Sequence, residues 1–507
     1  MKDIYLTQSG VYIKFDDFKE LNSKKEDYEI INFLKKKFTI KTKLIKKNFC
    51  LQTSQYHIQN GKNYKYMRLP RFGMFDLIKK SPKVYNLKNF NIVNKIKEGS
   101  DPIKPFVWKG EPKGNQKIIT DYIWEYFQKN VKCGSAGLIL NLDAGHGKSF
   151  IGLALIEKIQ KNTIIVVHNE SNLNQWVKIL KLYFPDNIDQ IGVYYGKKKI
   201  FRDITVCVIN SVCNDTLKIV KGKEVTEVSP LEIFSKYGFT IWDETQEFCS
   251  KQSSKSFWRL QTTYMIGLSA TPNERLDRFD PVSYWHIGNV LDAKTIPGYT
   301  EKDIKFKGHV SIINYLAKPI YTELILINDM ISVSMMITQL LEDPDRMTLI
   351  CDEINKLLEK KYNIFVFADR REYLNKIKEN LIECNILSSI LDNNNEDEIV
   401  RLVGGSKEAD MERAEQNSKV ILTTYQYMGV GKSIPKMNAI ILATPRKSKS
   451  RQFINRIFRL DSNYDIERQI IDIVDYGTPM KNQLNMRLKY YEEKQYTIEY
   501  TEIDKSK

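Results

Sequence analysis

Residues 138–149 limit the possible folds of this chain more than any other stretch. The apolar run Leu138–Leu142 leads into a loop with two glycines, and a helical pattern follows from Phe150. This order predicts a strand, a phosphate-binding loop and a helix, because residues without a Cβ let backbone N–H groups turn toward phosphate oxygens at a helix N-terminus. Lys148 is expected against the β- and γ-phosphates and Ser149 on Mg²⁺. The predicted nucleotide-binding residues of the loop are Ala144, Gly145, His146, Gly147, Lys148 and Ser149.

One position departs from the usual phosphate-loop pattern. Leu142 stands where that pattern has a glycine, five residues before Gly147. The strand before the loop and the helix after it still favour a phosphate loop. The alternative is a glycine-rich turn that precedes a core helix.

Composition excludes several classes of protein. The chain has 507 residues, 42% of them hydrophobic and 28% charged, which predicts about three globular domains. No apolar stretch is long enough to span a membrane and the N-terminus lacks a secretory pattern, so we expect a soluble intracellular protein with no membrane partner. Seven cysteines without a C-x-x-C pair argue against zinc ribbons and disulfides, and predict reduced, mostly buried thiols.

The positive charge is concentrated near the N-terminus. The formal net charge is +16, and residues 1–105 contain 23 lysines and arginines against 10 aspartates and glutamates, a net of +13. A basic region of this kind predicts a polyanionic partner; a solvated lysine-rich surface, or the codon bias of an AT-rich genome, is the alternative. Short β-type runs at 12–13, 38–40 and 64–70, with a turn at 71–73, predict a small mixed α+β domain.

After a proline-rich linker at 103–114, strands and helices alternate. The expected parallel strands lie at 163–167, 204–209, 239–242 and 264–268, and, after a less regular region at 280–335, at 363–368, 419–424 and 439–443. This pattern predicts an α/β fold with two successive parallel sheets covered by helices. The predicted domains are a basic N-terminal domain (1–105), two α/β domains (106–295 and 296–480) and a C-terminal tail (481–507).

Two adjacent carboxylates follow the predicted strand at 239–242. We expect Asp243 to bind Mg²⁺ through water and Glu244 to orient and deprotonate the attacking water, because a phosphate loop needs an acidic partner. The alternative is a helix N-cap or a solvated turn. After the next strand, Ser269 and Thr271 offer hydroxyl groups that are suited to linking the carboxylates to motions elsewhere; here the alternative is a plain turn that ends at Pro272.

Near the end of the chain, Gln452, Arg456 and Arg459 have spacings of four and three residues. These spacings predict that all three side chains share one face of a helix. Two guanidinium groups directed at one point suit the charge that develops on a γ-phosphate, as in an arginine finger. A solvated basic helix face is the alternative.

Together these four stretches resemble the superfamily 2 helicases, because they occur in that family's order and at spacings that fit two RecA-like domains. The chain is most similar to the branch that contains the XPB-type repair and transcription helicases, the UvsW-type phage helicases and the poxvirus transcript-release helicases. The features of that branch are Leu142, a stretch that ends in Gln175 and Trp176, and Arg275 and Asp277 after the Thr-Pro pair. The resemblance covers residues 112–480.

The resemblance implies further roles. Gln116 matches the glutamine that reads the adenine base, and Gln246 matches the position that couples hydrolysis to movement together with Ser269 and Thr271. Two residues depart from the family pattern: Gln246 replaces a histidine or aspartate, and Ser433, in the motif at 429–435, replaces an aspartate. The implied nucleic-acid contacts are Asn172, Gln175, Trp176 and Asn210 in the first domain, and Asp369, Arg370, Thr423 and Thr424 in the second.

The sequence and the resemblance together predict an ATP- and Mg²⁺-dependent helicase or translocase. Its expected partner is nucleic acid, with DNA or a DNA–RNA hybrid favoured over RNA, in contact with transcription or repair machinery and with no implied oligomer. A large DNA virus is the expected source, which would place the protein in host cytoplasm or a virion. The alternatives are an RNA helicase, a nucleic-acid-binding scaffold that has lost hydrolysis, and the translocating subunit of a restriction system.

Overall fold

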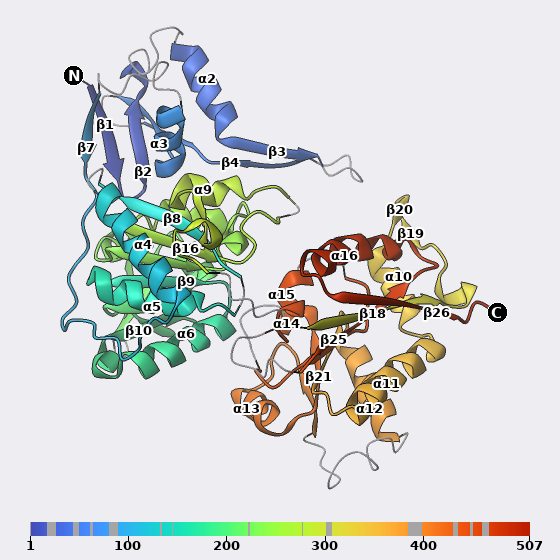
Figure 1. The fold of residues 1–507 in the computed structure, drawn as a ribbon. Coiled ribbons are helices and arrows are strands. Elements are labelled where there is room, and N and C mark those ends of the chain that lie inside the picture. The colour runs from blue at the N-terminus through green and yellow to red at the C-terminus, as the bar shows by residue number, and fades with distance from the viewer. Residues whose placement is uncertain are drawn as a thin grey trace. The chain divides into compact units, whose positions relative to one another are not determined.

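The computed structural model separates into two compact units, Met1–Glu301 and Lys302–Lys507 (Figure 1). Each contains one large sheet of parallel strands covered by helices, which confirms the predicted fold class. None of the described helices has the length and apolar character of a membrane span. The structure describes residues 2–17, 27–43, 50–60, 64–80, 90–131, 134–143, 145–221, 224–275, 277–300, 307–383, 398–428, 434–446, 450–458 and 466–507.

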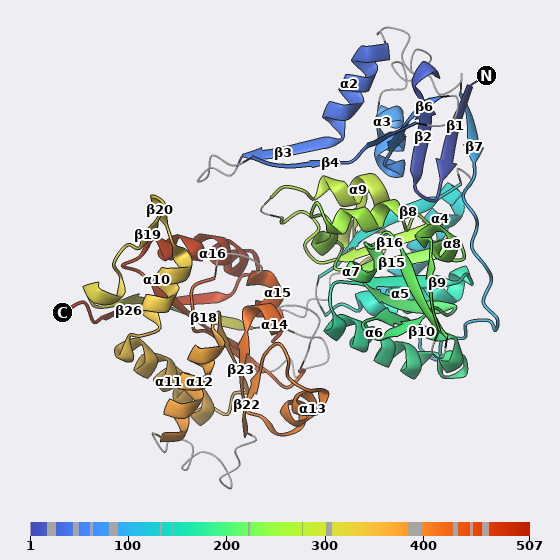
Figure 2. The same cartoon turned by 180° about the vertical axis from the view of Figure 1, so that it is seen from behind.

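A small mixed sheet begins the first unit. Its strands, in spatial order, are β5 (His57–Asn60), β6 (Lys65–Leu69), β2 (Gly10–Lys14), β1 (Lys2–Thr7) and β7 (Phe90–Asn94). Alternate residues of β1 and β2 are buried because one face of this sheet packs against helices α2 (Asp27–Lys37) and α3 (Arg71–Lys80). Two further strands, β3 (Thr39–Lys43) and β4 (Cys50–Ser54), form a separate antiparallel arm that continues from α2 (Figure 2). A short 3₁₀ turn, η1 (Phe15–Asp17), follows β2.

The turn predicted at residues 71–73 is wrong, because Arg71 is the first residue of α3. Pro70 precedes it, and the amide of Met74 already donates a helical hydrogen bond of 3.0 Å to the Pro70 carbonyl. The Arg71 side chain is fully buried and its guanidinium donates to Ser135 Oγ at 2.5 Å. Its other acceptors are the carbonyls of Thr7, Gln261 and Thr262, at 2.7 to 3.0 Å. One buried cation thus joins the N-terminal sheet to the rest of the first unit.

The parallel sheet of the first unit follows the linker. In spatial order its strands are β11 (Lys198–Ile200), β10 (Ile191–Tyr195), β12 (Ile204–Val208), β9 (Thr163–Val167), β15 (Phe239–Asp243), β16 (Tyr264–Ser269), β8 (Ala136–Asn141) and β17 (Val290–Asp292). Only β11 runs antiparallel to its neighbour among these described strands. The central strands are buried on both faces, which explains their continuous apolar sequences.

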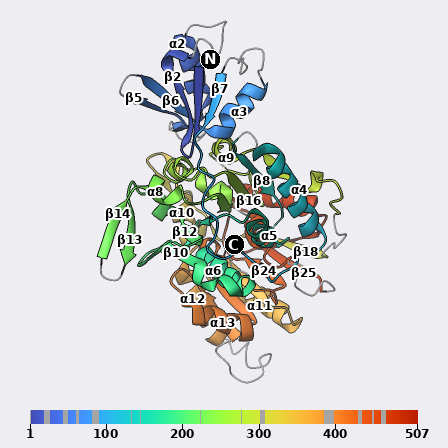
Figure 3. The ribbon, with the colours of Figure 1, turned by 90° about the vertical axis from the view of Figure 1, so that its left-hand side faces the viewer.

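Helices cover this sheet, with α4 (Asn115–Asn130), α5 (Lys148–Ile159) and α6 (Glu170–Tyr183) in front of it in Figure 1. The shorter elements are α7 (Ile209–Val212), α8 (Pro230–Phe234), α9 (Pro281–Ile287), η4 (Pro185–Gln190), η5 (Thr245–Phe248), η6 (Ser253–Trp258) and η7 (Ala293–Thr295). Strands β13 (Leu217–Lys221) and β14 (Glu224–Val228) form a hairpin that projects from the first unit (Figure 3). Its base is fixed because Leu217 is buried and the Lys218 amide donates to the Tyr194 hydroxyl at 2.8 Å.

His286 of α9 is buried where the N-terminal domain meets the parallel-sheet domain. Its Nε2 lies 3.0 Å from Gln55 Oε1, and Gln261 Nε2 lies 3.0 Å from its Nδ1. A neutral ring satisfies both contacts, since Nε2–H donates to Gln55 and Nδ1 accepts from Gln261. Burial, with the nearby positive charge of Arg68, holds the pKa of His286 well below its usual value.

Unfolding of the first unit is therefore expected to depend on pH. The unfolded chain binds a proton on His286 below about pH 6.5 whereas the folded chain does not, so the free energy of unfolding should fall by about 1.4 kcal/mol for each pH unit below that value. Urea unfolding of the full chain at pH 7.5 and 5.5 measures this effect. His286→Gln should have a smaller pH dependence than the parent; an equal dependence would assign the effect to other groups.

The second unit contains another parallel sheet. In spatial order its strands are β22 (Ile399–Leu402), β23 (Val420–Thr424), β21 (Ile364–Ala368), β24 (Ala439–Leu442), β25 (Arg468–Asp475), β18 (Gly308–Leu316) and β26 (Thr497–Asp504). The helices and 3₁₀ turns are α10 (Val333–Leu340), α11 (Pro344–Glu359), α12 (Arg371–Glu383), α13 (Glu408–Asn417), α14 (Tyr425–Met428), α15 (Ser450–Ile454), α16 (Leu484–Glu493), η8 (Pro319–Tyr321) and η10 (Pro479–Gln483). Strands β19 (Leu326–Ile327) and β20 (Met330–Ile331) form a small hairpin.

The last residues are not the tail that the sequence predicted. Strand β26 pairs along its whole length with β18, and α16 is anchored by a buried ion pair in which Arg487 donates to both oxygens of Asp472 at 2.8 and 2.9 Å. Tyr491 donates to the same carboxylate at 2.9 Å. These contacts link segments far apart in sequence, so local composition did not reveal them.

The described thiols agree with the prediction. Cys207, Cys213, Cys249 and Cys351 are buried thiols. Cys133 and Cys384, and the side chain of Cys50, lie outside the described residues.

Candidate functional site

The predicted phosphate loop connects β8 to α5. Gly145 and Gly147 both have left-handed backbone conformations, with φ of 83° and 85°, which other residues adopt rarely. A Cβ on Gly147 would also lie only 2.2 Å from Nε2 of Gln116. The backbone therefore curls as phosphate binding requires, and Ser149 lies in the first turn of α5 at the positive end of the helix dipole. Ala144 lies outside the described residues, and His146 donates its amide to the Asp143 carbonyl at 3.4 Å.

Leu142 fits the loop without a glycine. Its side chain is buried in the core, its φ is not positive, and its amide donates to the Ser269 carbonyl at 3.0 Å. Position 142 thus continues the extended backbone of β8, where a side chain is favourable. The Lys148 ammonium donates to the Leu142 carbonyl at 3.0 Å, which holds it over the loop.

Asp243 lies at the carboxyl end of β15, beside the phosphate loop. The indole Nε1 of Trp176 donates to Asp243 Oδ2 at 2.8 Å. Burial and then the charge of Glu244 raise the pKa of Asp243 to about 6, while the Trp176 hydrogen bond and the Lys148 charge oppose that rise. A carboxylate whose charged form is disfavoured by burial is suited to a bound cation.

The residues around Asp243 fit an Mg²⁺ ion bound together with nucleotide. Trp176 occupies one carboxylate oxygen, which leaves Oδ1 for a ligand, and Ser149 supplies a hydroxyl in the neighbouring loop. Across the described residues no cluster of three or more His, Cys, Asp or Glu side chains could hold a metal alone. One carboxylate and one hydroxyl suit Mg²⁺, because that ion takes one or two protein ligands and completes its shell with phosphate and water.

A chain of hydrogen bonds leads from Glu244 to the loop after β16. Gln246 Nε2 donates to Glu244 Oε2 at 2.6 Å, and Ser269 Oγ donates to Gln246 Oε1 at 2.6 Å. The Thr271 amide in turn donates to Ser269 Oγ at 3.0 Å. Glu244 itself has φ of 58° and ψ of 57°, a strained conformation that its surroundings must hold in place. The sequence predicted that these four residues lie together, and the structure brings them into direct contact.

Of the predicted helix face formed by Gln452, Arg456 and Arg459, the structure describes the side chain of Arg456 alone. Helix α15 ends at Ile454, and the amides of Arg456, Ile457 and Phe458 each donate to the carbonyl three residues earlier. Arg456 therefore lies in a tighter turn, where α-helical spacing does not apply. Arg459 and the side chain of Gln452 lie outside the described residues.

The predicted nucleic-acid contacts of the first unit divide into two groups. Gln175 and Asn210 are exposed. Trp176 and Asn172 are only 2% and 1% exposed, and their role in nucleic-acid contact stays a prediction. Trp176 packs against Gly152 and orients Asp243.

The second unit shows the same division. Arg370 is exposed and donates to Ser334 Oγ at 2.5 Å, and Asp369 accepts from Arg446 at 3.1 Å. Thr423 is fully buried and donates to the Leu402 carbonyl at 2.6 Å, and its contact with a nucleic-acid strand stays a prediction. Thr424 lies at the end of β23 and its hydroxyl accepts from the Tyr427 amide at 3.3 Å. Residues 429–433, including Ser433, lie outside the described residues.

Comparison with known proteins agrees with this geometry. The family model described as "Type III restriction enzyme, res subunit" matches residues 109–274. A protein of African swine fever virus, named as an ATP-dependent RNA helicase, is 29% identical over 378 residues, which cover 71% of this chain and 69% of that protein. A protein of Acanthamoeba polyphaga mimivirus, named in the same way, is 23% identical over 463 residues, covering 89% and 78%. These matches support an ATP-hydrolysing superfamily 2 helicase, similar to those of large DNA viruses.

The chain shares the fold of a solved restriction-enzyme subunit. A fragment of an HsdR subunit of a type I restriction enzyme from Vibrio vulnificus YJ016 aligns with a TM-score of 0.52 and 15% identity, covering 87% of this chain and 76% of that chain. The two parallel sheets are therefore tandem RecA-like domains.

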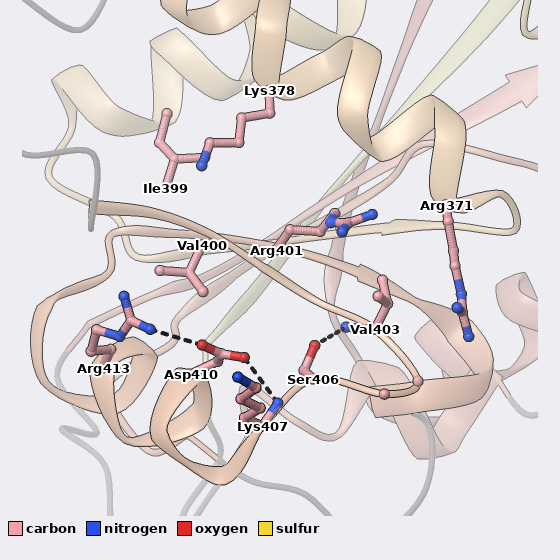
Figure 4. Close-up of a pocket in the computed structure, with 12 residues that line it drawn as sticks. Arg371, Lys378, Ile399, Val400, Arg401, Val403, Ser406, Lys407, Asp410 and Arg413 are labelled. Atoms are coloured by element: carbon pink, nitrogen blue, oxygen red, sulfur yellow. Dashed lines mark hydrogen bonds and ion pairs between the residues drawn. The ribbon is translucent and has the colours of Figure 1, made fainter.

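The helicase also has a basic cavity that sequence analysis missed. It encloses about 550 Å³ beside β22, at the sheet edge where β21, β22 and β23 end and where parallel sheets bind ligands. Figure 4 shows Asp410, the cavity's one acidic side chain, accepting from Arg413 and from the Lys407 amide, both at 2.9 Å. The cationic residues of the lining are Arg371, Lys378, Arg401, Lys407 and Arg413. These residues are scattered along the sequence, so no run of basic residues predicted the cavity.

Proposed function

We propose that the helicase uses ATP hydrolysis to move along DNA, as a duplex or a DNA–RNA hybrid, in transcription or repair. The observation that carries the proposal is the hydrogen-bonded chain from Glu244 through Gln246 to Ser269, because it connects a candidate catalytic base to a separate loop. Such a connection suits an enzyme that converts hydrolysis into movement. The choice of DNA rests on the branch resemblance and on the basic N-terminal domain.

In this proposal each part of the nucleotide site has one role. Gln116 reads the adenine, Lys148 neutralises the β- and γ-phosphates, and Glu244 accepts the proton of the attacking water. Mg²⁺, held by Ser149 and Asp243, supplies charge neutralisation of the phosphates. The residues proposed to stabilise the transferred phosphoryl group are Gln452, Arg456 and Arg459.

The proposed contacts with nucleic acid are mainly to its backbone. The exposed residues Gln175, Asn210 and Arg370, with the cavity beside β22, would bind phosphates irrespective of base sequence. Binding should therefore weaken steeply as salt concentration rises. Contacts with transcription or repair machinery belong to the same proposal.

A second candidate is a helicase that acts on RNA. The observation that favours it is that the relatives in African swine fever virus and mimivirus are both named as ATP-dependent RNA helicases. Superfamily 2 folds serve both substrates, so the fold does not choose between them.

ATP hydrolysis by the full chain distinguishes the two candidates. Rates are measured without nucleic acid and with single-stranded DNA, duplex DNA, branched DNA, RNA and an RNA–DNA hybrid, beside Glu244→Gln as the inactive control. Stimulation by DNA-containing substrates that vanishes in the control is the expected result. Stimulation by RNA alone would replace the proposal with the RNA helicase.

A further inference from the structure

The arm β3–β4 of the N-terminal domain lies against the loop that follows Thr271. Ile40 and Leu51 pack against the hydrophobic core of the parallel-sheet domain, so the arm rests on that domain. Thr42, which pairs with Leu51 across the arm, donates its hydroxyl to the Asp277 carbonyl at 2.7 Å. The N-terminal domain thus contacts the loop that follows Ser269 and Thr271, which belong to the chain of hydrogen bonds that begins at Glu244.

Arg275 connects this contact to the candidate catalytic base. Its Nε and Nη2 donate to the two carboxylate oxygens of Asp277 at 2.9 and 2.5 Å. The third donor, Nη1, is directed at the Gln246 carbonyl. This two-oxygen pairing fixes the plane of the guanidinium, so the direction of Nη1 depends on where Asp277 is held.

Gln246 is consequently held at both ends. Arg275 binds its main-chain carbonyl, while its side chain lies between Glu244 and Ser269. Gln246 is only 6% exposed. The left-handed backbone of Glu244 needs such restraints, because strained residues relax where neighbours do not hold them.

We propose that Arg275 is a positioning residue for ATP hydrolysis and that Thr42 of the N-terminal domain keeps the Arg275 guanidinium in position. The order of contacts is Thr42 to Asp277, Asp277 to Arg275, and Arg275 to Gln246, which bonds Glu244. The N-terminal domain therefore adjusts the geometry of the catalytic base. This inference rests on the proposed role of Glu244.

The test compares variants of the full chain by kcat and KM for ATP with saturating duplex DNA. Arg275→Lys keeps the charge but loses the planar fork, and we expect kcat to fall about 10- to 100-fold, as for a misplaced catalytic group, with KM nearly unchanged. Thr42→Val removes one hydrogen bond, and we expect kcat to fall about 2- to 10-fold. Thr42→Ser keeps the hydroxyl and should retain the parent kcat.

Two controls separate positioning from general damage. Thr39→Val alters the same arm, where the Thr39 hydroxyl bonds Lys35 and Ser54 and not the loop after β16, and should leave kcat unchanged. The double variant Thr42→Val with Arg275→Lys should have the kcat of Arg275→Lys alone, because Thr42 acts through Arg275. If Arg275→Lys does not fold, the kcat values of Thr42→Val and Thr42→Ser alone test the inference.

The inference is overturned if the kcat of Thr42→Val equals that of the parent, or if Thr42→Ser lowers kcat as much as Thr42→Val does. It is also overturned if the double variant loses kcat by the product of the two single losses. Glu244→Gln distinguishes this failure from that of the proposed function. An inactive Glu244→Gln beside normal Thr42→Val rejects only the coupling through the arm. An active Glu244→Gln rejects the role of Glu244 and the inference with it.

Discussion

Replacing Glu244 by Gln is expected to slow ATP hydrolysis by about 10²- to 10⁴-fold, the range that a positioned general base contributes. The amide has the size of the carboxylate and keeps a polar contact with Gln246, which lies 2.6 Å away, but it cannot accept a proton. ATP binding should be retained, because Lys148 and the loop glycines are unchanged. Single-turnover hydrolysis and the affinity for a fluorescent ATP analogue measure the two effects separately.

Glu232→Gln is the matched control. Glu232 is an exposed carboxylate of α8 in the same unit, so the substitution removes the same charge without touching the loop at Glu244. Its hydrolysis rate should equal that of the parent. If Glu244→Gln and Glu232→Gln both hydrolyse ATP at the parent rate, another group activates the water and Glu244 has no catalytic role.

Those parts of the fold with local sequence signals could be predicted. The strands β9, β15 and β23 are buried on both faces and appear as continuous apolar runs, and the glycines of the phosphate loop are required by positive φ. Glu244 and Ser269, which Gln246 connects, lie at the ends of two neighbouring parallel strands, β15 and β16, at one edge of the sheet. These features depend on residues near one another in sequence or on simple sheet geometry.

The burial of two predicted contact residues could be predicted from the direction of their side chains. Trp176 follows Leu173 by three residues and precedes Leu180 by four, which places it on the buried face of α6. Thr423 belongs to a strand that is buried throughout. The helical spacing of Trp176 and the apolar surroundings of Thr423 in its strand therefore indicated that both side chains are buried. The contacts of β26 and of Arg487 join distant segments, and no local pattern encodes them.

The second unit contains a buried ion pair between Arg346 and Asp475. Arg346 lies on α11 and donates to the two oxygens of Asp475 at 2.8 and 3.2 Å, and to the Ala443 carbonyl at 2.7 Å. Arg346 is fully buried and Asp475 is 2% exposed. The negative charge of Asp475 outweighs burial and raises the pKa of Arg346, so the ion pair persists at all working pH values.

Arg346→Met is expected to lower the free energy of unfolding of the second unit by about 3–5 kcal/mol, because it leaves the Asp475 carboxylate buried without its cation. Adding Asp475→Leu should restore stability, since an apolar pair of similar volume carries no desolvation cost. The control is Lys376→Met, which removes an ion pair of similar length, 3.0 Å to Glu342, whose side chains are 46% and 63% exposed; it should cost less than about 1 kcal/mol. Hydrogen exchange of the β25 peptide across a urea series reports on this unit alone, which matters because two units need not unfold together. Equal urea midpoints for Arg346→Met and Lys376→Met would show that burial of the pair does not determine its contribution.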